Sequence, residues 1–319
     1  LHHRTYASRL SAAFASRDCP RSVRKHMPDR GDVFSMIDET AAEIREMQTH
    51  SSSVVAVKAA NALRDLLDRD FETVDGYVRS LERNSSALRR AQPSHASLYN
   101  TQREIVTRVQ DGYFETIEAA KAETEAAIDD TVESVTTAKH GAAENAVEFL
   151  PDGVTVLTHD YSSTVVEAIE LAAGQGHHID VYVTEARPRY LGRKTARRLG
   201  AIDRVDATLV VDGAAGHHLD DCDRVLFGMS AIVDDTLYNR VGTFPIAATA
   251  AELAVPVSVV GASEKHIEDG FVFENEFRAS AEVIREPAEG FEVSNPAYDA
   301  TPTHLIANVA TENGIEKIE

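Results

Sequence analysis

Polar side chains gather at two points in the C-terminal half of the chain, each directly after an apolar run. The first group follows residues 154–157 and combines an imidazole and a carboxylate with two hydroxyls: His159, Asp160, Ser162 and Ser163. The second group, Glu185 and Arg187, follows residues 179–183. Carboxylates and imidazoles transfer protons, whereas an arginine beside helix amino termini suits a phosphate. These residues are therefore candidates for moving a proton and for binding an anion.

Hydrophobic periodicity places both groups in one kind of structural unit. Residues 154–158 and 179–184 are predicted as strands, and residues 162–173 and 189–199 as helices. Strand, helix, strand and helix at this spacing are typical of a right-handed parallel unit. In such sheets ligands bind beyond the carboxyl ends of the strands. We therefore expect the site at that edge of the sheet.

The rest of the C-terminal half continues the alternation with three further strands and two further helices. The strands are predicted at 207–211, 224–228 and 256–260, and the helices at 241–253 and 302–313. Five strands with intervening helices indicate an α/β fold with a doubly wound parallel sheet. We assign residues 151–319 to this domain.

Residues 31–150 show only helical periodicity and are predicted to form an N-terminal helical domain. Its helices are expected at 32–47, 54–63, 74–88, from Pro93-Ser94 onward, and at 114–149. Residues 1–30 differ, because seven Lys or Arg against two Asp give them a charge of +5. Two interpretations remain open for this basic tail: a disordered or over-extended start, and a functional basic arm.

Charge and composition exclude several classes of function. The chain has 52 acidic and 32 basic residues, a net charge of −20, and only seven of the bases are lysines. This field repels nucleic acid, and scarce lysine with abundant acid favours a halophilic, salt-adapted protein over an ordinary acidic one. No apolar run approaches the length of a membrane span. Two cysteines, Cys19 and Cys222, form no disulfide framework, so we expect a cytoplasmic protein without nucleic-acid or membrane partners.

Familiar cofactor and metal motifs are missing from the sequence. There is no G-x-x-x-x-G-K-[ST] phosphate loop, and Gly174-x-Gly176 follows a helix rather than opening the first strand–helix turn. The pairs His177-His178 and His217-His218 have no carboxylate or cysteine at a fitting spacing, so we interpret them as solvated loop residues. We expect neither a metal nor a cofactor.

Several short motifs occur in a specific order along the chain. They are His50-Ser51-Ser52-Ser53, Pro93-Ser94-His95-Ala96-Ser97-Leu98-Tyr99-Asn100, Thr158-His159-x-Tyr161-Ser162-Ser163, Thr184-Glu185-x-Arg187-Pro188 with Gly192-Arg193, Gly228, Asn239-Arg240-Val241-Gly242-Thr243, and Asn295-Pro296-Ala297-Tyr298-Asp299-x-Thr301-Pro302. Over residues 31–319 this order resembles the superfamily of translation initiation factor 2B alpha, beta and delta subunits, ribose-1,5-bisphosphate isomerase and methylthioribose-1-phosphate isomerase. The resemblance implies an N-terminal helical domain, a Rossmann-like C-terminal domain, and a homodimer or a heterodimer with a paralogue.

The resemblance implies two different activities, because the superfamily contains enzymes and regulatory subunits. Its isomerases move a proton between C1 and C2 of a ring-opened sugar phosphate, which needs an acid/base pair. At the positions of the family's catalytic cysteine and aspartate this chain has Asp160 and Ser230. It also has Arg240 for the usual lysine, and His50-Ser51-Ser52 for an Arg-Gly-Ala element that binds phosphate.

These departures favour a non-catalytic, translation initiation factor 2B-like regulatory subunit that binds a sugar phosphate or nucleotide phosphate, with translation initiation factor 2 as a partner. The alternative is an aldose–ketose isomerase related to the ribose-1,5-bisphosphate enzyme, with Asp160 replacing the thiol. A third reading is an inactive assembly partner of an active paralogue. The candidate ligand residues are His50, Ser51, Ser52, His159, Arg187, Arg193, Asn239, Arg240, Gly242 and Thr243.

Two of the candidate residues, and Asp299 of the last motif, also have structural interpretations that remain open. Arg187 and Arg193 are expected either to bind an anion or to form ion pairs with Glu185 or with an opposite subunit. Asp299 is expected to cap the last helix, or the turn at Pro302, or to contact the ligand.

Overall fold

The computed structural model describes residues 36–46, 52–267, 271–286 and 288–318. The tail that we predict at residues 1–30 and the candidate ligand residues His50 and Ser51 lie outside the described residues. The described helices and strands belong to one compact unit, Phe34–Glu319. Within this described part, no helix combines the length and the apolar character needed to cross a membrane.

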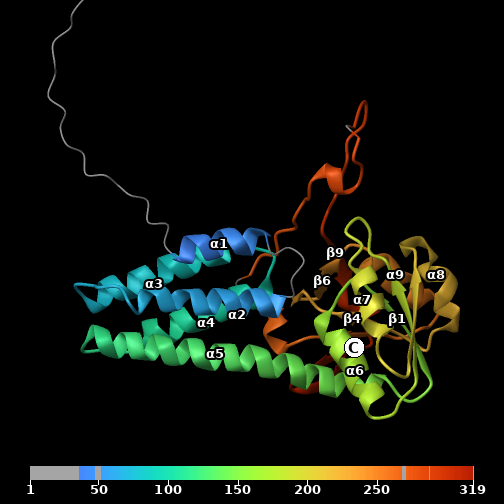
Figure 1. Cartoon of the computed structure of the whole chain (residues 1–319), viewed down its shortest axis with the longest axis horizontal. Helices are drawn as coiled ribbons and strands as arrows, with labels where there is room; N and C mark the ends of the chain where they lie inside the picture. Colours follow the sequence, from blue (N-terminus) through green and yellow to red (C-terminus); the bar gives the residue numbers. More distant parts are fainter. Residues whose placement is uncertain (1–35, 47–51, 268–270, 287, 319) are drawn as a thin grey trace, which may run out of the picture. The chain divides into compact units, whose positions relative to one another are not determined.

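The N-terminal half consists of helices that run beside one another, as we predict (Figure 1). They are α1 (Met36–Glu46), α2 (Ser52–Ala62), α3 (Val74–Arg89), α4 (Ala96–Asp111) and α5 (Ile117–Ala146). Threonine caps set two of the helix starts: Thr73 accepts a hydrogen bond from the amide of Gly76, and Thr116 accepts one from the amide of Ala119. Apolar side chains from all five helices share one core, in which Tyr77 is completely buried.

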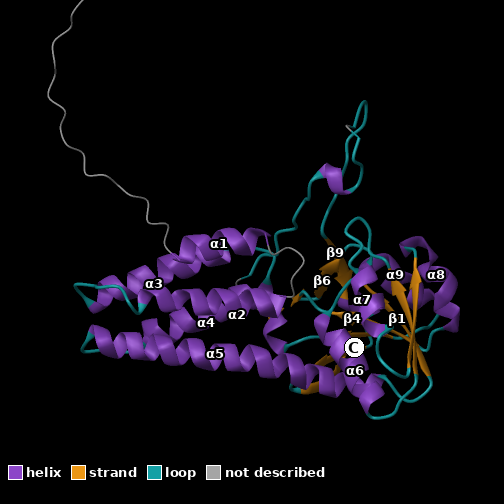
Figure 2. Ribbon diagram, viewed as in Figure 1, coloured by secondary structure: helices purple, strands orange, loops and turns teal. Residues whose placement is uncertain are grey.

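The C-terminal half contains a seven-stranded sheet with helices on both faces (Figure 2). Its strands, in spatial order, are β11 (Gly314–Lys317), β10 (Asn308–Thr311), β7 (Val257–Val260), β4 (Arg224–Gly228), β1 (Val154–His159), β2 (Ile179–Thr184) and β3 (Val205–Val210). All neighbours are parallel except β10 and β11. The chain runs outward through β2 and β3 on one side of β1, and through β4 and β7 on the other. The order therefore reverses between β1 and β4, which is the place where doubly wound sheets bind ligands.

The covering helices are α6 (Ser163–Gly174), α7 (Gly192–Leu199), α8 (Ala215–His218) and α9 (Thr243–Glu252). Alternate residues of β1 point to opposite faces of the sheet. Val156 packs in a core with α6 and the end of α5, whereas Leu157 packs in a second core with α9. Both side chains are completely buried, so the continuous apolar run of β1 reflects burial on both faces.

A second sheet, absent from the sequence prediction, closes over one edge of the first. Its order is β8 (His266–Ile267), β5 (Ala231–Val233), β6 (Thr236–Arg240) and β9 (Tyr298–Pro302). A two-residue turn that begins at Asp234, with φ 48°, joins β5 to β6. In the β6–β9 pair, Asn239 lies opposite Asp299 and Arg240 lies opposite Tyr298. This pairing carries two candidate ligand residues to the carboxyl end of β4.

The predicted helix at 302–313 is wrong. The chain there ends β9 at Pro302, makes a 3₁₀ turn at Thr303–Leu305, and adds β10 to the parallel sheet beside β7. Ile306, Val309 and Ala310 have the i, i+3, i+4 spacing of a helix face, but all three are buried along an extended chain. Such short apolar runs cannot be assigned from periodicity alone, because neighbouring strands decide the outcome.

The other predicted elements of this half occur with small shifts at their ends. The strand expected at 207–211 is β3, two residues earlier, and the helix expected at 241–253 is α9. The helix expected at 189–199 starts later, as α7, because Tyr190 adopts a left-handed backbone with φ 60°. A residue in that conformation cannot belong to a right-handed helix.

Candidate active site

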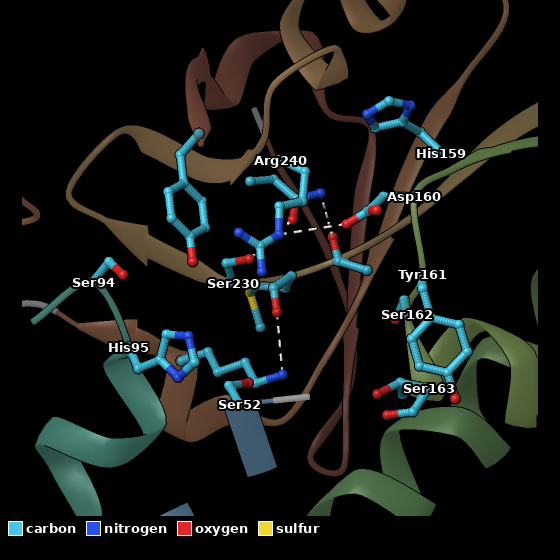
Figure 3. A pocket seen from close by; sticks show the side chains of 16 residues that line it. Ser52, Ser94, His95, His159, Asp160, Tyr161, Ser162, Ser163, Ser230 and Arg240 are labelled. Atoms are coloured by element: carbon cyan, nitrogen blue, oxygen red, sulfur yellow. Dashed lines mark hydrogen bonds and ion pairs between the residues drawn. The ribbon is translucent and has the colours of Figure 1, made fainter. Parts of the chain in front are cut away.

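A cavity of about 70 Å³ lies at the carboxyl ends of β1 and β4 (Figure 3). Its sheet wall comes from residues 159–164, 228–230 and 239–240, with Lys265 and Tyr298. Its helical wall comes from Ser52 at the start of α2 and from Ser94 and His95 before α4. The helices thus complete a site that the sheet edge begins.

Asp160 occupies the end of β1 in a strained conformation. Its backbone is left-handed, with φ 63°, and the Thr195 hydroxyl donates a 2.7 Å hydrogen bond to its carbonyl oxygen. Strain of this kind persists where the surroundings hold it, often at functional sites. The residue is 8% exposed, and burial raises the pKa of Asp160, against the opposing effects of Arg240 and His159. A carboxyl that is more basic than usual suits a general base near neutral pH.

Arg240 is the charged partner of this carboxyl. Its Nε lies 3.4 Å from Oδ2 of Asp160, and its guanidinium lies 4.6 Å from the ring centre of Tyr298. A second cavity, of about 30 Å³, shares Asp160 and Arg240 with the first and is also lined by Arg187, Arg189 and Arg278. The ion pair therefore separates two cavities, and both contain cations that suit an anionic ligand.

Ser230 and Asn239 form a connected pair beside the end of β4. The Ser230 hydroxyl donates to Oδ1 of Asn239 at 3.1 Å, and Nδ2 of Asn239 donates to the carbonyl of Gly228 at 3.0 Å. A Cβ atom at Gly228 would lie 2.3 Å from the Ser162 hydroxyl, so only glycine permits this approach to α6. Ser230 lines the cavity, but a hydroxyl of ordinary acidity is no substitute for a carboxylate base.

His159 lines the cavity, but the protein uses both of its ring nitrogens. Nε2 lies 2.8 Å from the carbonyl oxygen of Val241, which can only accept, so Nε2 carries the proton. Nδ1 then accepts from the Thr184 hydroxyl at 2.6 Å. The ring also fills the space beside Gly242, where a Cβ would lie 2.6 Å from its Cε1 atom. These contacts describe a residue that supports the cavity wall.

Four predicted ligand residues do not line the larger cavity: Arg187, Arg193, Gly242 and Thr243. Arg187 lines the second cavity. Arg193 forms the ion pair that we considered, with Nη2 2.8 Å from Oε2 of Glu185.

Asp299 receives the amides that we expected to bind the anion. The amides of Gly242 and Phe244 donate to its Oδ2 atom at 2.6 and 3.1 Å. Asp299 therefore caps α9, and not the C-terminal helix or turn for which we considered it, because β6–β9 pairing places it beside the start of α9.

Ser94, His95 and Lys265 line the cavity but are not among the site residues predicted from the sequence. Lys265 is 6% exposed, its Nζ donates to the carbonyl oxygen of Met229 at 3.1 Å, and burial lowers its pKa. It follows β7, whose carboxyl end lies at the same edge as β1, and this position could have indicated it. Nothing local in the sequence indicates that Ser94 and His95, from the helical half, reach this edge.

The arrangement combines groups that suit an anion with a carboxyl that suits proton transfer. The first turn of α6 faces the cavity at Ser163 and Thr164, and Ser162 caps it by accepting from the amide of Val165 at 3.3 Å. Helix amino termini bind phosphate through free amides and the helix dipole. Lys265 and Arg240 are the cationic residues of the same cavity, and Asp160 is its carboxyl with a raised pKa.

Similar proteins support an enzymatic interpretation. The chain is 33% identical over 306 residues to a ribose 1,5-bisphosphate isomerase of Haloterrigena turkmenica, covering 90% of this chain and 92% of that protein. It is 31% identical to the protein of the same name from Haloferax volcanii, with 90% of each chain covered. Six relatives with this name are 29–33% identical to the chain.

The preferred hypothesis from the sequence, a non-catalytic regulatory subunit, is therefore wrong. A relative named as the alpha subunit of translation initiation factor 2B, from Dictyostelium discoideum, matches only 53% of this chain, whereas the isomerases match nearly all of it. That hypothesis rested on the departures from the family's residues at Asp160, Ser230, Arg240 and His50-Ser51-Ser52. At residue 160 the structure has a buried carboxyl with a raised pKa.

The fold is shared with solved structures of the same kind. A translation initiation factor 2B structure from Pyrococcus horikoshii matches 91% of this chain and 97% of its own, with a TM-score of 0.74 at 22% identity. The model of the Initiation factor 2 subunit family matches residues 48–317 of the sequence. Together with the relatives above, this match confirms the resemblance from which the sequence motifs were interpreted. The chain belongs to the initiation factor 2 subunit family.

Proposed function

We propose that this protein is an aldose–ketose isomerase of phosphorylated pentoses, with ribose 1,5-bisphosphate as the first substrate to test. The observation that carries the proposal is Asp160: a strained, buried carboxyl of raised pKa, placed in a cavity that also contains cations and a helix amino terminus. The names of the relatives supply the substrate class.

The reaction converts a sugar phosphorylated at C1 into a ketose without loss of any atom. The bond from C1 to the ring oxygen breaks, and its electron pair stays on that oxygen. The carboxylate of Asp160 takes the proton from C2, and the C–H electron pair forms a C1–C2 double bond. The protonated carboxyl then returns the proton to C1 while C2 becomes the carbonyl carbon. The proton released by the C2 hydroxyl ends on the former ring oxygen, so charges and atoms balance.

One carboxyl is sufficient for both proton transfers at carbon, since C1 and C2 are adjacent. This removes the need for a second carboxylate at Ser230. The pKa of Asp160 is raised by burial and held in check by Arg240, which keeps the base ionised when the reaction begins. Lys265 and the start of α6 are the groups that we assign to a phosphate.

The test follows the C2 hydrogen through the reaction. Ribose 1,5-bisphosphate labelled with deuterium at C2 is incubated with the purified protein, and the product is analysed by NMR. We expect ribulose 1,5-bisphosphate with part of the deuterium at C1, because a single carboxyl carries it there. Asp160→Asn should reduce kcat by about 10²–10⁴-fold, the usual contribution of a general base.

The control is Asp180→Asn, which neutralises an exposed carboxylate near the start of β2. It should retain wild-type turnover. A wild-type protein without turnover, or an Asp160→Asn variant with full turnover, would show that the proposal is wrong.

A further inference from the structure

His95 occupies an unusual position at the start of α4. It is the N-cap residue of this helix, with an extended backbone at φ −96° and ψ 100°, yet its side chain makes no capping hydrogen bond. N-cap side chains commonly accept from the first helical amides, which histidine does poorly. The ring instead lines the large cavity, projecting from the helical wall (Figure 3). The position is thus not explained by helix formation.

The ring is buried in a polar region without complete bonding. His95 is 6% exposed, and its Nδ1 atom has no hydrogen-bond partner among the described residues. Burial, with Arg240 and Lys265 nearby, lowers the pKa of His95 to about 3. The ring is therefore neutral throughout the physiological range and carries one N–H.

The surroundings select which nitrogen carries that proton. A buried N–H without an acceptor is less tolerated than a nitrogen lone pair without a donor. Nδ1 is therefore the bare nitrogen, and Nε2 carries the proton. Since the ring lines the cavity, Nε2–H is the donor that it offers to a ligand.

We propose that His95 is a second catalytic residue, whose neutral ring donates a hydrogen bond from Nε2 to the sugar oxygen that gains negative charge as C1 loses its bond to the ring oxygen. This inference rests on the isomerase function proposed above. His95 neither gives up nor gains a proton, since the C2 hydroxyl supplies the proton that finally resides on that oxygen. A donor aimed at a developing charge strengthens its bond in the transition state and so lowers the barrier.

The role also fits the division of work across the cavity. Asp160 on the sheet wall acts on hydrogen bound to carbon, and His95 on the helical wall acts on oxygen. A neutral donor is preferable here, because a positively charged imidazolium in the same cavity would favour the ionised form of Asp160 and so lower its basicity. Burial, followed by the positive charge of Arg240 and Lys265, lowers the pKa of His95 and so favours the neutral ring.

The experiment compares three side chains at residue 95. His95→Leu removes the donor, His95→Gln keeps an amide N–H near the position of Nε2, and His95→Asn places one near Nδ1. We expect His95→Leu and His95→Asn to lower kcat by about 10²–10³-fold, the usual effect of losing a single oxyanion donor, with KM within about threefold. His95→Gln should recover at least about tenfold of that loss.

Each outcome separates this inference from the proposed function. Wild-type turnover with full kcat in His95→Leu, or a raised KM at unchanged kcat, overturns the role of His95 and leaves the isomerase intact. No turnover in the wild type overturns both. If the variants do not fold, ¹⁵N NMR of the wild-type imidazole decides. A neutral ring with its proton on Nε2 at neutral pH supports the proposal, and a proton on Nδ1 or a titration near pH 6 overturns it.

Discussion

The two walls of the large cavity differ in how much of their polar chemistry the protein itself uses. On the sheet wall, His159 is bonded to Val241 and Thr184 through its two ring nitrogens, and Ser230 donates to Asn239. On the helical wall, His95 has a ring nitrogen without a partner among the described residues. Two histidines in one cavity thus have opposite roles. Hydrogen-bond partners decide whether a polar residue supports a wall or faces a ligand, and residue type does not.

The largest effect should come from the ion pair of the sheet wall. Arg240→Gln removes the cation that opposes the rise in the pKa of Asp160, so that pKa should rise further. Since Asp160 acts as a carboxylate, the acid limb of the kcat/KM profile should move to higher pH. We expect kcat/KM near neutral pH to fall by about 10²–10³-fold.

Arg240→Lys is the matched control and should recover part of the activity, because it keeps the charge and loses only the planar guanidinium. Measured pH–rate profiles check both variants. An acid limb that does not move in Arg240→Gln would mean that Asp160 is not the titrating base.

His159→Ala should affect stability more than any other single change on the sheet wall. It removes the hydrogen bond to the Val241 carbonyl, leaves the Thr184 hydroxyl with only its long bond to the Thr158 carbonyl, and opens space beside Gly242. We expect the free energy of unfolding to fall by about 2–4 kcal/mol. Urea unfolding measures this loss. If His159→Ala keeps the wild-type free energy of unfolding, His159 does not support the sheet wall, and the proposed difference between the two walls is wrong.

His95 should instead appear in the acid dependence of stability. Its pKa falls from the ordinary 6.5 to about 3 on folding, so between these values the unfolded chain binds a proton that the folded protein excludes. Stability therefore falls as pH decreases below 6.5. At pH 5 the resulting loss in the free energy of unfolding is about 2 kcal/mol.

His95→Gln does not titrate and should lose that part of the acid dependence. The measurement is urea unfolding of both proteins at pH 7 and pH 5, with the other titrating groups common to both. Equal acid dependence in the two proteins would show that the His95 ring titrates normally and is not the neutral donor that we infer.

Ser230→Ala should have the smallest effect. Its hydroxyl is bonded to Asn239, which keeps its second bond to the carbonyl of Gly228. We expect kcat to decrease less than about fivefold, corresponding to the loss of one ordinary hydrogen bond of about 1 kcal/mol. Steady-state kinetics checks this. A loss comparable to that of Asp160→Asn would show that Ser230 takes part in catalysis. Residues after the carboxyl ends of both β1 and β4 would then contribute to the reaction.

The sheet was largely predictable from the sequence because its central strands are long apolar runs bounded by turn residues. Residues 154–158 and 179–184 have no competing helical pattern. The C-terminal strands were not predictable in the same way, since Ile306, Val309 and Ala310 also match a helix face. Pairing of β10 with β7, far apart in the sequence, decides the conformation there.

The site was predictable only in part. Residues that directly follow a strand could be placed from the sequence, whereas contacts between residues far apart in the chain could not. Asp160 follows directly on β1, so strand prediction alone places it at the ligand edge. Gly242 and Thr243 also belong to a strand–helix turn, but the carboxylate of Asp299 binds the amide of Gly242. That contact is between residues 57 positions apart and has no local signal.

The sequence by itself determined the α/β alternation, the edge of the sheet at which the cavity lies, the family, and the presence of the Asp160 carboxylate at that edge. Each of these depends on residue type and local spacing. Only the tertiary structure decided that Asp160 is buried and basic, that His159 supports a wall, and that His95 and Lys265 reach the cavity. The physical reason is that burial, pairing and electrostatic environment arise from residues distant in the chain, and these set the protonation states on which the chemistry depends.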